Sequence, residues 1–148
     1  MTARDLVIAG CSRRKNRSKR LLPALDRYTG GIAPQLRERV AGHPDTRRRV
    51  RFLSAAYGLV TADTPLPFYE RPLTPHQASI VRPKVAEQLA EEFRTGGVPD
   101  RILLVLEPAY VTLLADLTAR ADCPALHWVG DPRGWPQAAA VLDDWRWP

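Results

Sequence analysis

The chain has 148 residues, of which 45% are apolar, and its 22 Lys and Arg outnumber 16 Asp and Glu, for a formal net charge of +6. This composition is typical of a globular protein rather than a disordered one, and the length predicts a single domain over residues 1–148. No run of about 18 apolar residues occurs, so we expect no membrane span. The first residues lack the apolar stretch of a secretory signal, and two cysteines are too few for a disulfide framework, so a cytoplasmic location is expected.

The positive charge is concentrated in the amino-terminal part of the chain. Residues 1–60 hold 14 Lys and Arg but only 4 Asp and Glu, whereas residues 61–148 hold 8 and 12. This asymmetry predicts an anionic partner for the amino-terminal part. A basic surface that faces only solvent is the alternative. The cysteines and histidines form no recognisable metal-binding pattern, so we expect neither a metal nor a cofactor.

The first elements in chain order are a strand, a basic loop and a helix. The apolar run at residues 6–10 is rich in β-branched side chains and predicts a buried strand. Residues 11–20 have no apolar periodicity and predict an exposed loop. Residues 21–31 contain one proline and two glycines, which indicate irregular structure or one helical turn. A helix is expected over residues 34–40, with proline in its first turn.

A second strand and a long helix are expected next. Residues 50–55 predict the strand, and residues 56–60 close it as a turn. The three prolines of residues 61–73 indicate a stiff connection, and loops of this length are often functional. A helix capped at its amino terminus by a threonine follows over residues 75–93, and we expect Pro83 to kink or divide it.

The last third of the chain continues the alternation of strands and helices. Strands are predicted at residues 101–106 and 125–129, with a helix between them that starts near residue 108, and a final helix is predicted over residues 136–144. The alternation predicts an α/β fold: a single three-layer, Rossmann-like domain with a mostly parallel sheet of four or more strands.

Three polar segments directly follow predicted strands, at residues 11–15, at residues 54–59 and at Glu107. The carboxyl ends of parallel strands lie at one edge of a sheet, where ligands collect. We therefore expect the basic loop and Glu107 to share one crevice.

The basic loop has six Lys and Arg among residues 12–20. Ser12, Arg13, Arg14 and Lys15 are candidates to hold a phosphate group, because guanidinium, ammonium and hydroxyl groups bind its oxygens. The alternative is a solvated basic face, and no Walker pattern is present. Nearby cations favour a thiolate, so Cys11 is a candidate nucleophile, although a small buried residue at a strand end is the plainer interpretation.

Carboxylates that follow strands are candidates for acid–base catalysis. Glu107 comes directly after an apolar strand, where partial desolvation would suit a general acid or base, and an ion pair with a loop arginine is the alternative. Asp63 and Glu70, from the proline-rich segment, are expected to reach the same edge of the sheet and are further catalytic candidates. Tyr69 in the same segment is a candidate to contact substrate.

The second strand end contributes further candidate binding residues. Ser54 and Tyr57 offer hydroxyl groups, and Gly58 would allow a ligand to approach the backbone closely. A turn that requires glycine explains the same residues equally well. The four tryptophans all lie in the last 21 residues. Most are expected to attach the last helix to the sheet, with Trp135 as the best candidate for an exposed ring.

Motifs in the first half of the chain resemble a widespread bacterial and phage family of uncharacterised domains. They comprise Cys11-Ser12-Arg13-Arg14-Lys15, Pro23-Ala24 with Tyr28 and Gly30, Phe52-Leu53-Ser54-Ala55-Ala56-Tyr57-Gly58-Leu59, and Tyr69. The first motif is also similar to one in the middle domain of archaeosine synthases, which is related to uracil-DNA glycosylase-like folds. That resemblance implies a Rossmann-like domain that handles nucleobases, nucleotides or nucleic acid, and it adds Tyr28 to the candidate binding residues.

These observations lead to one main hypothesis and two alternatives. The main one is an enzyme, a hydrolase or transferase, that acts on the N-glycosidic bond of a nucleotide or of a nucleic-acid base, with phosphate on the basic loop and Glu107 near the sugar. The alternatives are a non-catalytic nucleic-acid-binding module and thiol chemistry at Cys11. The expected partner is nucleotide or nucleic-acid phosphate and not a membrane, and the oligomeric state, including a homodimer, stays open.

Overall fold

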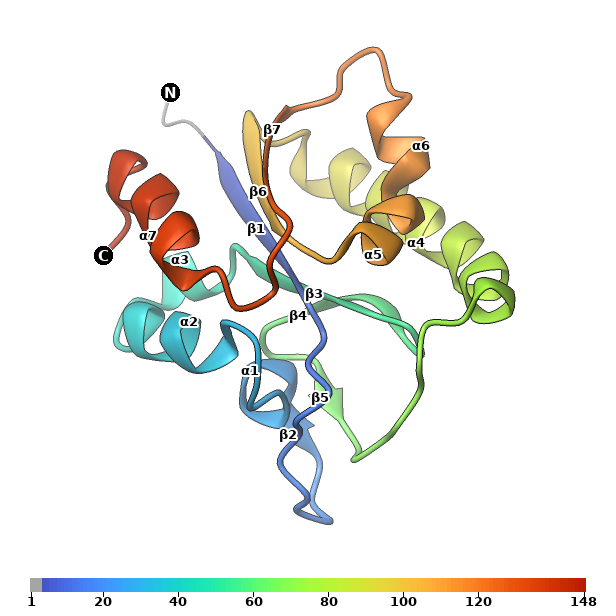
Figure 1. Cartoon of the computed structure of the whole chain (residues 1–148). Coiled ribbons are helices and arrows are strands. Elements are labelled where there is room, and N and C mark those ends of the chain that lie inside the picture. Colours follow the sequence, from blue (N-terminus) through green and yellow to red (C-terminus); the bar gives the residue numbers. More distant parts are fainter. Residues whose placement is uncertain (1–3) are drawn as a thin grey trace.

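The computed structural model describes residues 4–148, which fold around a five-stranded sheet (Figure 1). The strands lie in the order β4-β3-β1-β6-β7. They span Asp5–Gly10 (β1), Val50–Ser54 (β3), Gly58–Thr61 (β4), Arg101–Val105 (β6) and Ala125–Val129 (β7). Strands β3, β1, β6 and β7 are parallel, and only β4 runs antiparallel to its neighbour. The prediction of an α/β fold with a mostly parallel sheet is therefore confirmed.

Helices cover both faces of this sheet (Figure 1). One face packs against α1 (Ala24–Arg27), α2 (Ala33–Val40) and α7 (Trp135–Asp144), and the other against α4 (Pro75–Gly96), the 3-10 turn η1 (Thr112–Leu114) and α6 (Ala115–Thr118). The remaining elements are α3 (Pro44–Arg47), α5 (Pro108–Val111) and a small antiparallel pair of β2 (Leu22–Pro23) with β5 (Pro65–Leu66).

Strand β1 is buried on both faces because it lies in the middle of the sheet. Side chains of a strand alternate between faces, so Val7 and Ala9 join the core beneath α1, α2 and α7. Leu6 and Ile8 join the second core beneath α4. This placement explains why the sequence of β1 is continuously apolar.

Two sequence predictions about regular structure were incomplete. Residues 56–60 were expected to be only a turn, but Gly58 begins strand β4, which pairs with β3 as a tight hairpin. The helix expected from residue 108 is interrupted and consists of α5, η1 and α6 in succession.

Helix α4 is continuous although Pro83 lies within it. The Thr74 side chain caps it by accepting a hydrogen bond from the Gln77 amide at 3.1 Å. Proline removes one helical hydrogen bond, and at the exposed position of Pro83 water can solvate the carbonyl group left over. Of the two alternatives expected at Pro83, a kink or a division of the helix, the division was wrong.

The tryptophans near the carboxyl end have different environments. Trp145 and Trp147 are buried and hold the end of the chain against the sheet, as expected. The exposed ring belongs to Trp128, with 53% of its surface accessible, whereas Trp135 packs against the core. The choice of Trp135 was therefore wrong. Over the described residues, none of the helices combines the length and apolar character that crossing a bilayer requires.

Candidate active site

A cleft of about 870 Å³ lies at the carboxyl edge of the parallel strands. Its walls come from five parts of the chain: residues 10–15 after β1, residues 29–35 before and in α2, residues 70–73 before α4, residues 107–110 after β6, and residues 132–133 after β7. The basic loop and Glu107 thus line the same cleft, as the order of strands predicted.

Positive charge dominates the lining of the cleft. The cationic side chains are those of Arg13, Arg14, Lys15, Arg71 and Arg133, and the carboxylates are those of Glu70 and Glu107. Arg13 and Arg14 are exposed, and no hydrogen bond or ion pair joins either guanidinium group to another side chain within residues 4–148. Their donors are therefore available to an anion.

The buried guanidinium of Arg27 holds the basic loop in place. Arg27 has no exposed surface, and it donates hydrogen bonds to the carbonyl groups of Asn16, Ser18 and Arg20 on the loop and of Leu66 at 3.0 Å. The Asn16 amide donates to the Arg27 carbonyl at 2.8 Å. The segment between β1 and β2 extends away from the sheet (Figure 1), yet these bonds fix the backbone that carries its cations.

Ser12 has a structural role in the loop rather than a free hydroxyl group. Its hydroxyl donates to the Arg14 carbonyl and accepts from the Gly30 amide at 3.1 Å. A side chain at Gly30 would crowd Ser12 and Arg14, at 3.1 and 3.3 Å from the added carbon, so glycine permits this close approach. The expectation that the Ser12 hydroxyl binds phosphate is not supported, because its single donor hydrogen is used by the Arg14 carbonyl.

Cys11 and Tyr110 meet on the floor of the cleft. The Cys11 Sγ lies 3.2 Å from the Tyr110 hydroxyl. This contact joins the end of β1 to α5. Burial, and next the nearby Cys11, raise the pKa of Tyr110 far above its usual value of 10, so that its hydroxyl stays protonated and can donate. Tyr110 also comes one helical turn after Glu107, whose charge contributes to the same increase in pKa.

Glu107 occupies the N-cap position of α5 and is exposed. The expectation that burial desolvates its carboxylate was wrong, because the chain turns away from the sheet directly after Leu106. Within the described chain, Glu107 is not paired with a loop arginine either. Its carboxylate lines the cleft and is available to a ligand.

Lys15 lies over the ring of Tyr69, with its Nζ 4.8 Å from the ring centroid. Partial burial lowers the pKa of Lys15 below its usual value of 10.5, although the nearby Cys11 and Glu70 oppose this effect. The aromatic face beneath the ammonium group fixes its position at the cleft wall.

Three hydroxyl groups beneath Lys15 form a hydrogen-bonded chain. The Tyr69 hydroxyl lies 2.5 Å from that of Tyr28 and 2.7 Å from that of Ser54. Tyr28 and Ser54 are buried, and none of the three residues lines the cleft. Their selection as substrate-binding residues is therefore not supported, because they bond to one another and form the support on which Lys15 rests.

The turn after β3 also lies outside the cleft lining. Ser54 accepts hydrogen bonds from the amides of Ala56 and Tyr57, both at 3.1 Å, and so closes the turn. Gly58 has a φ of 72°, and a side chain there would clash with Gln88. Of the two interpretations of Tyr57 and Gly58, ligand binding or a turn that requires glycine, the structure supports the turn.

Asp63 lies at the opposite end of the sheet from the cleft. Strand β4 runs antiparallel, and its last residue, Thr61, pairs with Arg51 near the start of β3. Asp63 forms an ion pair with Arg47 at 2.8 Å. The prediction that Asp63 reaches the same edge as Glu107 was wrong because the hairpin reverses the chain. Glu70 does line the cleft, with Arg17 3.8 Å away.

Four residues of this site were missed by the sequence analysis. Tyr110 could have been found, because it follows Glu107 by three residues at the start of a predicted helix. Arg71, Arg133 and Arg27 gave no comparable signal, since nothing local distinguishes them from surface arginines.

The described residues contain no group of three His, Cys, Asp or Glu side chains that could hold a metal ion. Comparison of the chain with protein-family models, with curated proteins and with solved structures gives no match. The resemblance noted from the sequence motifs therefore stays a prediction, and a function has to be inferred from the geometry of the cleft.

Proposed function

We propose that the cleft binds a nucleotide, or a nucleotide unit of a nucleic acid, and cleaves or transfers at its N-glycosidic bond. The observation that carries this proposal is the presence in one cleft of unpaired arginines on a fixed loop and an exposed carboxylate at a neighbouring strand end. The three-layer, Rossmann-like arrangement and the cytoplasmic location expected from the sequence belong to the same proposal.

The basic loop supplies the phosphate-binding part. Arg13 and Arg14 present guanidinium groups that can each donate two hydrogen bonds to phosphate oxygens, and Lys15 adds a fixed ammonium group. Because Arg27 orders the loop before a ligand binds, little conformational entropy is lost on binding. Arg71 and Arg133 contribute positive charge from the other walls.

Glu107 is the catalytic carboxylate in this proposal. When the bond between the base nitrogen and C1′ breaks, its electron pair leaves with the base, and the sugar acquires positive charge that a carboxylate stabilises. Water then forms the new bond to C1′ and gives its proton to Glu107, while the departing base takes a proton from solvent. The protonated Tyr110 hydroxyl can orient the sugar or the water as a hydrogen-bond donor.

Release of free base tests the proposal. The purified protein is incubated with a panel of ribo- and deoxyribonucleotides and the free bases are separated and quantified. We expect release by the wild type, about a hundredfold loss in Glu107→Gln, and wild-type rates in the control Asp63→Asn, which removes a carboxylate outside the cleft. Full activity in Glu107→Gln would exclude the assigned role, and absence of release from every nucleotide would reject the activity.

A nucleic-acid-binding module without catalysis is the second candidate. Beyond the cleft, the loop exposes Arg17, Lys19 and Arg20, and the Arg17 guanidinium lies 5.2 Å from the centre of the exposed Phe68 ring. Cations beside an aromatic ring are typical of single-strand binding surfaces. This function predicts binding of a single-stranded oligonucleotide without base release. The logarithm of its affinity should fall with the logarithm of the salt concentration, with a slope of about 0.7 for each phosphate contacted. An affinity that is independent of salt would contradict it.

A further inference from the structure

A second, smaller cavity lies at the amino edge of the sheet, away from the cleft. It has a volume of about 220 Å³, and four of the ten residues that line it are arginines: Arg4, Arg48, Arg49 and Arg51. We propose that this cavity is a binding site for a small phosphate-bearing anion, either inorganic phosphate or a phosphate monoester. The function proposed for the cleft does not assign any role to these arginines.

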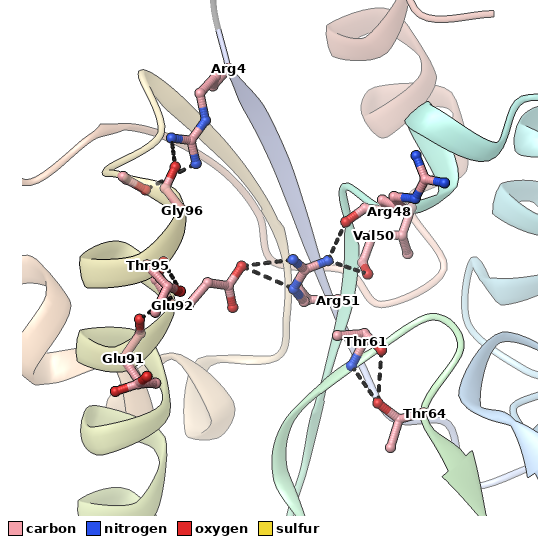
Figure 2. A network of polar contacts seen from close by, with 11 residues as sticks. Arg4, Arg48, Val50, Arg51, Thr61, Thr64, Glu91, Glu92, Thr95 and Gly96 are labelled. Atoms are coloured by element: carbon pink, nitrogen blue, oxygen red, sulfur yellow. Dashed lines mark hydrogen bonds and ion pairs between the residues drawn. The ribbon is translucent and has the colours of Figure 1, made fainter.

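Two of the arginines that line the cavity already have partners within the protein. Arg51 pairs with Glu92 of α4 at 2.8 Å and donates to the backbone carbonyl groups of Arg48 and Val50, as Figure 2 shows. Arg4 donates to the carbonyl groups of Gly96 and Gly97 at the carboxyl end of α4. The remaining carboxylate of the lining, Asp5, is bound by Arg101 and by the indole of Trp147 outside the cavity.

Arg48 and Arg49 are therefore the groups that an anion would meet. Arg48 has only an exposed ion pair with Asp45, and such pairs contribute little stability. The half-buried Arg49 side chain has no hydrogen bond or ion pair with the part of the chain that the structure describes. The lining holds four guanidinium groups against two carboxylates, so an anion with two negative charges balances it.

The backbone holds Arg49 in place for this role. Its carbonyl accepts from the Val7 amide at 2.9 Å, which ties it to β1 before β3 begins. Arg49 lies in the turn directly before β3, and it lines the cavity together with Arg51 of that strand. Guanidinium groups that line one cavity can bind the oxygens of one phosphate with paired hydrogen bonds.

Phosphate binding must be measured without interference from the cleft. The parent protein for this test therefore carries Arg13→Gln with Arg14→Gln, and its unfolding temperature is followed during titration with phosphate and with chloride at equal ionic strength. We expect phosphate to stabilise this parent more than chloride does. Adding Arg49→Gln should weaken the phosphate affinity about tenfold, since a charge-assisted pair is lost. Adding Arg94→Gln, an exposed arginine of α4 outside the cavity, should leave the affinity unchanged.

A second measurement needs no substitution in the cavity. In the wild type, the NMR signal of the Arg49 side-chain Nε–H group should shift on addition of phosphate or of a phosphate monoester. Equal stabilisation by phosphate and chloride, unchanged affinity in Arg49→Gln, or a stationary Arg49 signal would each overturn the proposal. Base release from nucleotides is assayed separately, so failure of this site leaves the proposed function of the cleft untouched.

Discussion

The thiol of Cys11 and the hydroxyl of Tyr110 meet at 3.2 Å, and this contact joins the end of β1 to the helix that begins at Glu107. It places the thiol in the lining of the cleft, together with the basic loop and the exposed carboxylate of Glu107. Alkylation of Cys11 can therefore report ligand binding, whether or not the thiol takes part in catalysis.

Bound nucleotide should protect Cys11 from alkylation. A ligand in the cleft covers the thiol, so the rate of its reaction with iodoacetamide should fall about tenfold at saturation. Cys123, which is also partly buried but does not line the cleft, provides an internal control whose rate should stay constant. Mass spectrometry of the two cysteine peptides measures both rates. Equal rates at Cys11 with and without nucleotide would show that the ligand binds elsewhere.

Replacing Arg27 should destabilise the fold and weaken anion binding together. In Arg27→Met the carbonyl groups of the loop and the buried carbonyl group of Leu66 lose their donors, and we expect a loss of about 3 kcal/mol in the free energy of unfolding. Urea titration measures the change. Lys19→Met is the matched control: it removes an exposed cation of the same loop and should change stability by less than about 0.5 kcal/mol. Similar stability of Arg27→Met and Lys19→Met would mean that Arg27 does not organise the loop.

Anion binding in the cleft should depend on the protonation of Lys15. Partial burial lowers its pKa below 10.5, so the positive charge is lost at a lower pH than in an exposed lysine. The affinity for a nucleoside monophosphate should therefore fall as the pH rises from about 7 to about 10, and it should fall less in Lys15→Arg, whose guanidinium stays charged. Calorimetric titrations at several pH values measure this. Parallel profiles for the two proteins would exclude Lys15 as the group responsible.

The buried tyrosines should make the fold sensitive to alkali. Burial raises the pKa values of Tyr28, Tyr69 and Tyr110 above the usual 10. These groups stabilise the fold fully below pH 10, and the contribution is lost as the pH rises above 10, because the unfolded chain then releases protons that the folded chain retains. Denaturant unfolding at rising pH should show this loss, with tyrosinate absorbance appearing together with unfolding. Tyrosinate formation by all four tyrosines in the folded protein would contradict this prediction.

The sequence predicted the parts of the site that follow from local patterns. The apolar runs of β1 and β6 are clear strand signals, and parallel strands end at one edge of a sheet. The order of the segments along the chain is therefore enough to predict that Arg13 and Glu107 line one cleft. Asp63 was misplaced because β4 is only four residues long and was mistaken for part of a turn. Because this reversal of the chain was missed, Asp63, which follows β4, was expected at the wrong end of the sheet.

The support beneath the site could not be predicted in the same way. Arg27 lies in a short segment where an arginine usually faces solvent, and its partners are carbonyl groups of Ser18 and of the distant Leu66. Tyr28, Tyr69 and Ser54 carry hydroxyl groups that suit a ligand, yet they bond to one another. Residue type does not distinguish these cases, because the difference depends on which partner the tertiary fold brings near.

A crystal structure of the protein with a bound nucleoside monophosphate tests the central claim most directly. We predict the phosphate against Arg13, Arg14 and Lys15, with C1′ of the sugar facing Glu107. A nucleotide that binds outside this cleft, or one in the cleft with its sugar turned away from Glu107, would contradict the account.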